Sequence, residues 1–365
     1  MKRRTLIKLR QLSIIICAWL IVGFLITVYD YFVLNTRSSL GLSAEYSFLF
    51  SLAINSGAAL TGALLGGSFL VFFVNVRYQD KPYGYTIIAV SSFFIFVIVL
   101  IAFIIGIIIA PIQTGNFLFD NARTIKSVIV WSVVVALTQL FLQMNSKFGY
   151  GVFWNIIRGK YNTPKKEKRI FMSLDLNEST ATAEKLGDEK YHELLKDFFA
   201  DITNPVLDNM GEIYQYVGDE VIVAWKYGDG IANNRCVKCF FDMKSNIEWK
   251  KEKYLNRYGM VPSFKAGIHW GNVVVGEVGI IKRDITYSGD VMNTTSRIRD
   301  RCREFNVDII ASVDLLEELS SGNPSLWEES YVTRQLGAIK LRGKEKEVLL
   351  SSLALATTSQ SDTLI

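Results

Sequence analysis

Two aspartates stand where a strand is expected to end in a turn. Asp175 follows the apolar residues 170–174, and Asp219 follows residues 214–217 as part of a Gly-Asp pair. Carboxylates on neighbouring strand ends can share a Mg²⁺ ion that keeps open positions for the phosphates of a substrate. Either aspartate alone would be an ordinary cap or turn residue, so the prediction of a metal site depends on the two together.

A helix is expected to begin shortly after Asp175, at Ser179 and Thr180. The first backbone N–H groups of a helix have no partner within the helix, and the positive end of the helix dipole attracts anions. This stretch therefore suits a triphosphate that lies next to the predicted metal carboxylates.

A second group of polar residues comes later in the chain. Asn293 and Arg297 are four residues apart in a segment, 291–305, that is expected to be helical, so both project from one face. The amide can orient a ribose, and the guanidinium can neutralise charge that develops on phosphate. Without further context, both residue types are commonplace on an exposed helix.

The elements that must position these residues alternate without a regular βαβ rhythm. The pattern of apolar and polar residues predicts a buried strand (170–176), an amphipathic helix (179–207) and a β-hairpin with Asp219 at its tip (211–225). A charged helical stretch (229–258), two further strands (263–270 and 272–278), a loop, the helix 291–305 and shorter strands toward residue 353 are expected to follow. Frequent hairpins favour an α+β domain in which helices cover one mixed sheet.

Taken in order, these motifs resemble those of class III nucleotidyl cyclases. Residues 171–180 and the segment 216–219 resemble the two metal motifs of the family, and residues 286–297 resemble its transition-state motif. The Leu-Arg-Gly-Lys sequence at 341–344 resembles the segment that carries the family's phosphate-contacting lysine, here Lys344. The resemblance covers about residues 169–353 and does not extend to the apolar region before them.

The resemblance implies a two-metal mechanism that makes a 3′,5′-cyclic nucleotide and pyrophosphate. Asp175, Asp219 and the Leu176 carbonyl would hold two Mg²⁺ or Mn²⁺ ions. Asn293 and Arg297 would act on the ribose and on the reacting phosphate. In this family the aspartates and the Asn/Arg pair of one site come from different protomers, so the resemblance also implies a head-to-tail homodimer with two equivalent sites.

The two positions that select the base in this family are occupied here by Gln215 and Thr286. Thr is similar to a subgroup of adenylyl cyclases that includes bicarbonate-responsive members, whereas Gln replaces the usual Lys. Both side chains can form hydrogen bonds with adenine or with guanine. The Thr segment favours ATP as substrate and cyclic AMP as product; a guanylyl cyclase that makes cyclic GMP is the open alternative, and bicarbonate sensitivity is also left open.

Two other interpretations fit less of the sequence. A diguanylate cyclase would have Gly-Gly before its acidic hairpin residue, where Val217 and Gly218 stand here, and would not explain Asn293 and Arg297. A catalytically inactive nucleotide-binding membrane sensor would be expected to have lost a metal carboxylate. Both aspartates are present, so a working adenylyl cyclase in signal transduction is favoured.

The first 147 residues are expected to form an all-α membrane region. Crossing an apolar core of roughly 30 Å takes roughly 20 apolar residues in a helix, and four runs qualify: 12–34, 47–76, 86–112 and 124–145. Lys and Arg cluster before the first run, between the second and third, and after the fourth, which predicts that these segments are cytoplasmic. We expect an integral protein of a bacterial inner or plasma membrane whose catalytic domain is cytoplasmic.

Three further segments complete the predicted organisation. Residues 148–168 mix aromatic and basic side chains and are expected to form a connector at the membrane surface. Residues 169–354 form the predicted cyclase domain, and residues 355–365 a disordered tail. The net charge of +5 arises from basic residues next to the membrane, which favours contact with membrane lipid and not with nucleic acid.

Overall fold

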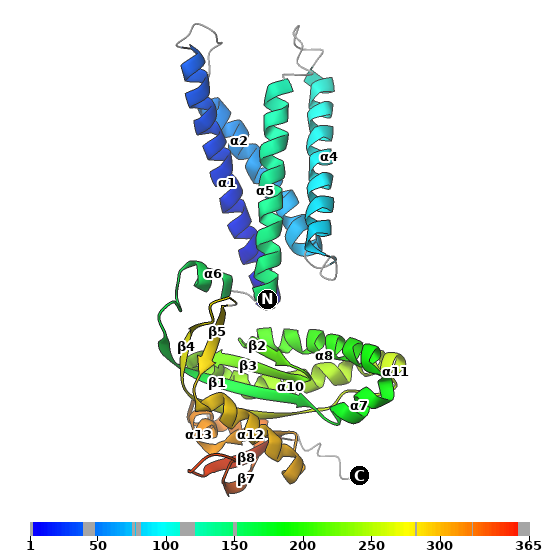
Figure 1. Ribbon diagram of the computed structural model, residues 1–365, viewed down its shortest axis with the longest axis vertical. Helices are drawn as coiled ribbons and strands as arrows, with labels where there is room; N and C mark the ends of the chain where they lie inside the picture. Colours follow the sequence, from blue (N-terminus) through cyan, green and yellow to red (C-terminus); the bar gives the residue numbers. More distant parts are fainter. Residues whose placement is uncertain are drawn as a thin grey trace, which may run out of the picture. The chain divides into compact units, whose positions relative to one another are not determined.

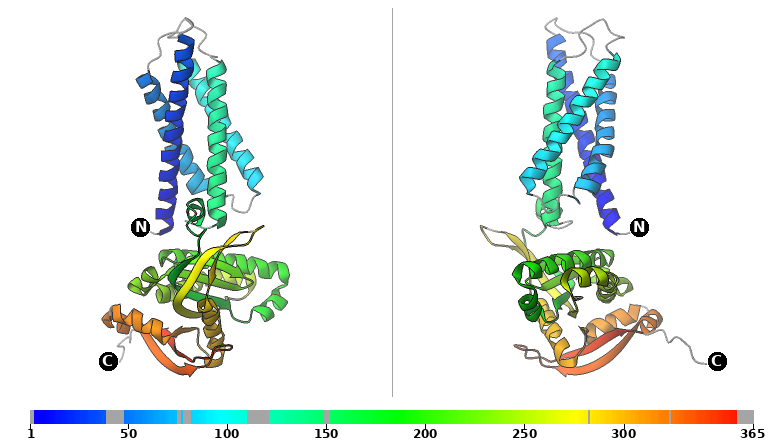
Figure 2. Two further views of the ribbon diagram at one scale, coloured as in Figure 1. Left: turned by 60° about the vertical axis from the view of Figure 1, so that its left-hand side comes forward. Right: turned by 90° about the vertical axis from the view of Figure 1, so that its right-hand side faces the viewer.

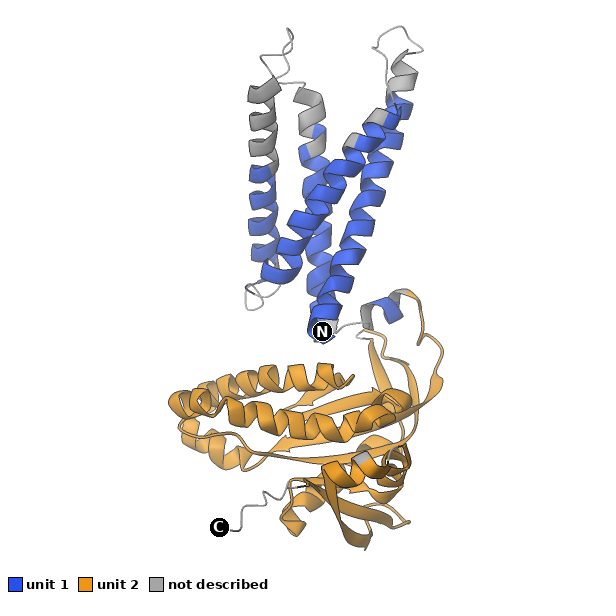
Figure 3. Ribbon diagram, turned by 180° about the vertical axis from the view of Figure 1, so that it is seen from behind, with its two compact units in different colours: residues 1–157 blue, residues 158–365 orange. Residues whose placement is uncertain are grey.

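The computed structural model describes residues 3–38, 48–74, 82–109, 121–148, 152–281, 283–322 and 324–356, together with residue 77 (Figures 1 and 2). The chain divides into two compact units, Met1–Ile157 and Arg158–Ile365, which Figure 3 colours separately. Each unit has a hydrophobic core of its own.

The first unit consists of long helices and short π-helical segments that continue α2: α1 (Arg3–Ser38), α2 (Phe48–Gly62), Ala63–Gly67, Phe69–Val74, α4 (Tyr83–Ile109) and α5 (Asn121–Phe148). Three described stretches are long and apolar enough to cross a membrane: Arg3–Val33, Ser51–Val74 and Val128–Lys147. A shorter apolar stretch, Gly84–Val97, lies in α4. The predicted run 86–112 ends with residues 110–112, which lie outside the described residues.

Polar side chains connect the helices of this unit. Trp19 Nε1 of α1 donates a hydrogen bond to Thr138 Oγ1 of α5 at 3.0 Å, and Lys126 of α5 pairs with Asp30 of α1 at 2.5 Å. In an apolar medium an unsatisfied polar group costs several kcal/mol, so such pairs favour one arrangement of the helices over others.

The second unit is built on one eight-stranded mixed sheet. Its strand order is β2-β3-β1-β4-β6-β8-β7, and β5 pairs with β4 outside this path. Strands β4 and β6 are parallel, and the other described pairs are antiparallel. The bounds are β1 (Lys165–Leu176), β2 (Glu212–Val217), β3 (Glu220–Lys226), β4 (Phe264–Val278), β5 (Asp284–Ser288), β6 (Ile309–Ser312), β7 (Tyr331–Ile339) and β8 (Val348–Leu355). The predicted α+β class with one mixed sheet is confirmed.

Helices cover both faces of this sheet. Their bounds are α7 (Ser179–Leu186), α8 (Asp188–Asp208), α9 (Tyr227–Ile231), α10 (Arg235–Trp249), α11 (Lys251–Tyr258), α12 (Asp290–Phe305), α13 (Val313–Gly322) and α14 (Pro324–Ser330). The short helix α6 (Val152–Ile157) belongs to the first unit. Alternate residues of β1 face opposite sides. Met172 lies in the large core with Phe198 of α8 and Phe240 of α10, whereas Phe171 packs in a second cluster with Val291 of α12.

Two glycines of β4 allow α12 to pack directly on the sheet. A β-carbon at Gly267 would lie 2.4 Å from Arg299 N and 2.5 Å from Thr295 O, which are backbone atoms of the helix. A β-carbon at Gly271 would lie 2.6 Å from Val291 Cγ2. These separations are shorter than van der Waals contact, so only glycine permits this approach. The helix that carries the predicted transition-state residues is thereby fixed on the strand beside β1.

The structure differs from the sequence-based expectations in five segments. The single helix predicted over 179–207 is two helices, because Gly187 between them has a left-handed φ of 77°. The two strands predicted over 263–278 are the one strand β4, and part of the loop predicted before α12 is the strand β5. β1 begins at Lys165, within the expected connector, and β8 ends at Leu355, within the expected tail; residues 357–365 lie outside the described residues.

Candidate active site

Asp175 and Asp219 lie together at one end of neighbouring strands. Asp175 is the penultimate residue of β1, and Asp219 lies in the turn between β2 and β3. β1 and β3 are paired up to Leu174 and Val221, which brings this turn beside Asp175. Burial raises the pKa of the Asp175 carboxyl, the charge of Arg299 lowers it, and the nearby Asp219 raises it further, so that the net direction is upward.

The donor set of this site fits a divalent metal. Two neighbouring carboxylates repel each other when both are charged, and a bound cation relieves that repulsion. Leu176 ends β1 directly after Asp175, and its backbone carbonyl adds a third hard oxygen of the kind that Mg²⁺ prefers. Throughout the described residues there is no group of three or more His, Cys, Asp or Glu that could hold a metal. A metal held here would have Asp175, Asp219 and the Leu176 carbonyl as its protein ligands.

Two residues beside the aspartates were not predicted from the sequence. Lys265 stands opposite Asp175 in the β1–β4 pairing, and its Nζ lies 3.5 Å from Asp175 Oδ2. Tyr191 of α8 lies near Ser179; burial and then the charge of Asp219 raise the pKa of its hydroxyl. Neither residue belongs to a short sequence motif. Each is brought to the aspartates only by the folding of the sheet and the helices on it.

The turn after β1 leads directly into α7, which begins at Ser179 as predicted. Glu178 precedes the helix with a left-handed φ of 52°, and Asn177 N donates a hydrogen bond to Ser263 O at 2.9 Å, which ties the turn to the chain before β4. Ser179 is half-buried and Thr180 is exposed. The first N–H groups of α7 thus follow Asp175 within a few residues, and such groups can bind phosphate.

The other predicted residues gather around the start of α12. Asn293 is exposed and Arg297 is half-buried on this helix. Lys344 Nζ lies 2.8 Å from Asp290 Oδ2, and this hydrogen bond lowers the pKa of the Asp290 carboxyl. A β-carbon at Gly343 would lie 3.5 Å from Arg297 Nη2, so the guanidinium stands beside the turn that carries Lys344. Two cations and an amide are therefore close together.

The two groups belong to different elements of the chain. Over the part of the chain that the structure describes, Asn293, Arg297 and Lys344 form no ion pair with Asp175 or Asp219. The aspartates lie at the end of β1 and in the β2–β3 turn, whereas the other residues belong to α12 and the turn before β8.

The predicted base-selecting residues lie on β2 and β5, whose neighbouring residues are in contact. Gln215 is exposed next to a bulge in β2, and Thr286 of β5 is half-buried opposite Gly276. Tyr287 N donates to the Tyr214 hydroxyl at 3.4 Å, and the centroids of the two rings are 4.7 Å apart. β2 and β5 therefore meet at the residues that adjoin Gln215 and Thr286.

His269 lies on β4 close to the second group. Its Nδ1 is 2.8 Å from Ser312 Oγ, and burial followed by the charge of Lys344 lowers its pKa from 6.5 to about 4. The imidazole is thus neutral in the folded protein at pH 5, at which the unfolded chain binds a proton. Because the unfolded state then binds more protons than the folded state, stability falls as the pH drops from about 6.5 to about 4.

We expect His269→Gln to reduce this acid sensitivity. The shift in pKa corresponds to at most about 3 kcal/mol of stability, lost between neutral pH and pH 4. Thermal unfolding midpoints of the detergent-solubilised protein at pH 7 and pH 5 measure the effect. His192→Gln, which changes the exposed histidine of α8, is the matched control. An equal midpoint difference in His269→Gln and in the unsubstituted protein would contradict the expectation.

Comparison with known proteins agrees with this fold. The model of the adenylate and guanylate cyclase catalytic domain matches residues 163–351. Adenylate cyclase 2 of Rhizobium meliloti (strain 1021) is 33% identical over 234 residues, which are 64% of this chain and 63% of that protein. Adenylate cyclase 1 of the same organism is 25% identical over 178 residues, 47% of this chain and 25% of that protein. The chain thus spans less than two thirds of either relative.

A solved structure of a bacterial light-regulated adenylyl cyclase is similar in fold. It covers 61% of this chain and 63% of its own, with a TM-score of 0.51 and 17% sequence identity. The family match includes β1, the β2–β3 turn, α12 and the first half of β8, and hence every predicted site residue. The chain belongs to the family of adenylate and guanylate cyclase catalytic domains.

Proposed function

We propose that this protein is a membrane-bound adenylyl cyclase that converts ATP to 3′,5′-cyclic AMP and pyrophosphate for signal transduction. The observation that carries the proposal is the pair of carboxylates, Asp175 and Asp219, brought together in a chain of this family. The similarity to an adenylate cyclase over 64% of the chain, and Thr286 at the base-selecting position, support ATP over GTP.

Asp175, Asp219 and the Leu176 carbonyl would hold two Mg²⁺ or Mn²⁺ ions. Bound metal would supply positive charge that stabilises the reacting oxygen and the triphosphate. The N–H groups at the start of α7, with the hydroxyls of Ser179 and Thr180, bind the phosphates. This end of the sheet thereby places the α-phosphate for attack.

The residues on and beside α12 orient the ribose and stabilise the charge that develops during cyclisation. Asn293 orients the ribose so that its 3′-oxygen faces the α-phosphorus, opposite the pyrophosphate. The 3′-hydroxyl releases its proton to solvent and its oxygen forms a bond to the α-phosphorus. The bond from this phosphorus to the bridging oxygen breaks, and pyrophosphate leaves. Arg297 and Lys344 neutralise the charge that develops on the phosphates. Gln215 and Thr286 form hydrogen bonds with the adenine edge. No covalent intermediate with the protein is needed.

A homodimer completes the proposed site. In this family a site takes its aspartates from one protomer and its Asn/Arg pair from the other, and among the described residues no ion pair joins Arg297 or Lys344 to Asp175 or Asp219. The aspartates of one protomer would then face Asn293 and Arg297 of its partner. Two equivalent sites then arise from one twofold axis. The apolar helices α1, α2 and α5 support insertion among membrane lipids, and the basic segments beside them support a cytoplasmic catalytic unit.

Complementation tests the shared site. Asp219→Ala and Arg297→Ala are each expected to be nearly inactive, but co-expression should restore cyclic AMP formation to about a quarter of the normal level, because about half of the dimers are mixed and each mixed dimer has one intact site of two. Co-expression of Asp219→Ala with Asp175→Ala, which leaves no intact site, is the control. Activity of the first mixture at the control level would contradict the shared site.

A further inference from the structure

A polar network joins the β2–β3 turn to β1 and α12. Glu220 follows Asp219, begins β3 and is 18% exposed. Its Oε1 atom accepts hydrogen bonds from Ser173 Oγ at 2.6 Å and from Ser296 Oγ at 3.2 Å, and it lies 2.9 Å from Arg299 Nη1. Three groups from β1 and α12 thus converge on one carboxylate oxygen.

Arg299 is held in place on its other sides as well. The side chain is 12% exposed, and its Nη1 also donates to Ser173 Oγ at 3.0 Å. Its Nη2 and Nε donate to Asp300 Oδ1 at 2.8 and 3.2 Å. The backbone of Arg299 rests on β4 at Gly267. The guanidinium therefore cannot move far from Glu220 unless α12 itself shifts.

This network adjoins both aspartates of the proposed metal site. Ser173 precedes Asp175 by two residues on β1, so the two side chains share a face of the sheet. Arg299 is the cation that acts most strongly on Asp175. If Arg299 were absent, the charge of Glu220 would add to that of the two aspartates, and like charges at short range repel. The turn that carries Asp219 would then lose the contact between Glu220 and Arg299, and charge repulsion would push it away from β1.

We propose that Glu220 and Arg299 are positioning residues that hold Asp219 beside Asp175 and thereby set the affinity of the site for divalent metal. The inference rests on the proposed function and extends it to residues outside the family's motifs. Neither residue contacts substrate in this account. Both act by anchoring the β2–β3 turn to β1 and α12.

The same contact connects the two sites of the proposed dimer. Each chain gives its aspartates to one site and the residues of α12 to the other. Ser296, which donates to Glu220, directly precedes Arg297. A displacement of the metal-binding turn is therefore transmitted to the helix that serves the second site.

Metal binding by Arg299→Gln in the full-length protein tests the proposal. The loss of the free Mn²⁺ EPR signal, measured with a non-cyclisable ATP analogue, gives a dissociation constant without turnover. We expect this constant to rise about 10-fold or more, as is typical when the partner of a metal ligand is removed. The Mg²⁺ concentration for half-maximal cyclic AMP formation should rise in parallel. Glu220→Gln keeps the shape of the side chain and should shift both quantities in the same direction.

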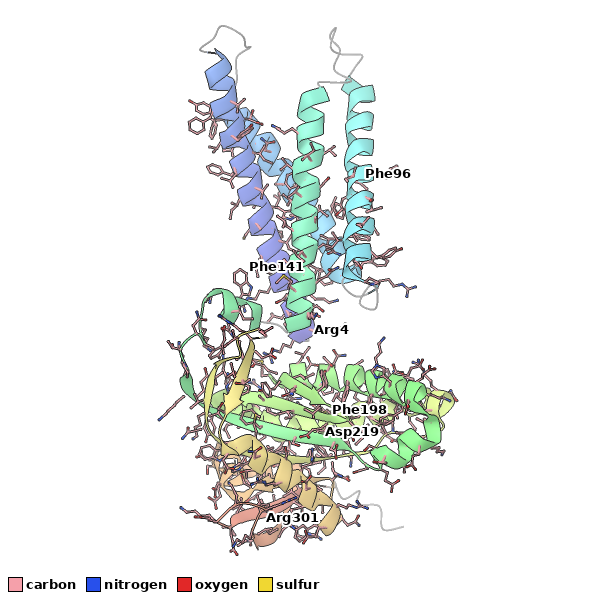
Figure 4. The ribbon with its side chains drawn as sticks, in the orientation of Figure 1. Arg4, Phe96, Phe141, Phe198, Asp219 and Arg301 are labelled. Carbon is pink, nitrogen blue, oxygen red and sulfur yellow. The ribbon has the colours of Figure 1, made fainter. Side chains whose placement is uncertain are left out.

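Arg301→Gln is the matched control. Arg301 lies two residues further along the same helix, labelled in Figure 4, and pairs with Glu304 at 2.7 Å instead of with the hairpin. Its metal affinity should remain unchanged. If both variants fold and their Mn²⁺ dissociation constants stay within twofold of normal, the proposal is overturned. If Arg299→Gln does not fold, a normal dissociation constant in Glu220→Gln alone overturns it.

This experiment distinguishes failure of the positioning role from failure of the proposed function. If the unsubstituted protein makes cyclic AMP and both variants bind Mn²⁺ normally, the positioning role is wrong and the proposed function stands. If the variants bind Mn²⁺ weakly but the unsubstituted protein makes no cyclic nucleotide, the anchoring of the metal site stands and the proposed function is wrong.

Discussion

Alanine at Asp219 is expected to lower cyclic AMP formation about 1,000-fold or more. The substitution removes one of the two carboxylates of the site and with it several kcal/mol of charge stabilisation that a bound metal supplies. Asp219, labelled in Figure 4, lies in a turn between two strands, so the loss of its side chain leaves the sheet pairing intact. Asp175→Ala should have an effect of similar size, because the two carboxylates act as a unit.

Product formation by purified full-length protein, followed by chromatography with Mn²⁺ present, measures this loss. Glu252→Ala, which removes an exposed carboxylate from α11, is the control and should retain normal activity. The melting temperature of each variant should stay close to normal. A folded Asp219→Ala protein with more than a tenth of normal activity would remove the aspartate from the metal site.

Replacing Arg297 with alanine is expected to lower kcat by about 100- to 1,000-fold while KM for ATP changes little. In the proposed mechanism the guanidinium acts on charge that develops during transfer of the α-phosphate, so its contribution is larger in the transition state than in the bound substrate. Its position beside the Gly343 turn places it with Lys344, a second cation for the same phosphates.

Steady-state kinetics at saturating Mg²⁺ separates these effects. Arg303→Ala, an exposed position on the same helix, serves as the control and should leave both constants unchanged. A large increase in KM with normal kcat would show that Arg297 binds ground-state substrate only and would exclude it as a transition-state residue.

The proximity of Asp175 and Asp219 could largely be predicted from the sequence. The apolar run before Asp175 and the Gly-Asp pair at Asp219 are local signals, and neighbouring strands place them together. The start of α7 at Ser179 was predicted for the same reason, since helix starts depend on a few adjacent residues.

The remaining features depend on contacts between distant segments. Lys265 meets Asp175 only because β4 pairs with β1, and Arg299 reaches Glu220 only because Gly267 lets α12 rest on the sheet. Strand β5 was missed because its few residues show no strong alternation and are stabilised by pairing with β4.

Gly187 illustrates a different limit. The amphipathic pattern continues across Gly187 into α8, so the pattern alone predicts one helix. The structure has two helices, α7 and α8, with Gly187 at a positive φ between them. The helices of the first unit, by contrast, follow directly from long apolar runs, whose signal does not depend on distant contacts.

The most direct test of the central claim is cyclic nucleotide formation by the detergent-solubilised full-length protein, given ATP or GTP separately with Mg²⁺ or Mn²⁺ and with Asp219→Ala as a blank. We expect equimolar cyclic AMP and pyrophosphate from ATP, dependence on the metal, and little cyclic GMP from GTP. Cyclic GMP as the main product would contradict the assignment of Gln215 and Thr286 to adenine. No cyclic nucleotide from either substrate would contradict the proposed activity itself.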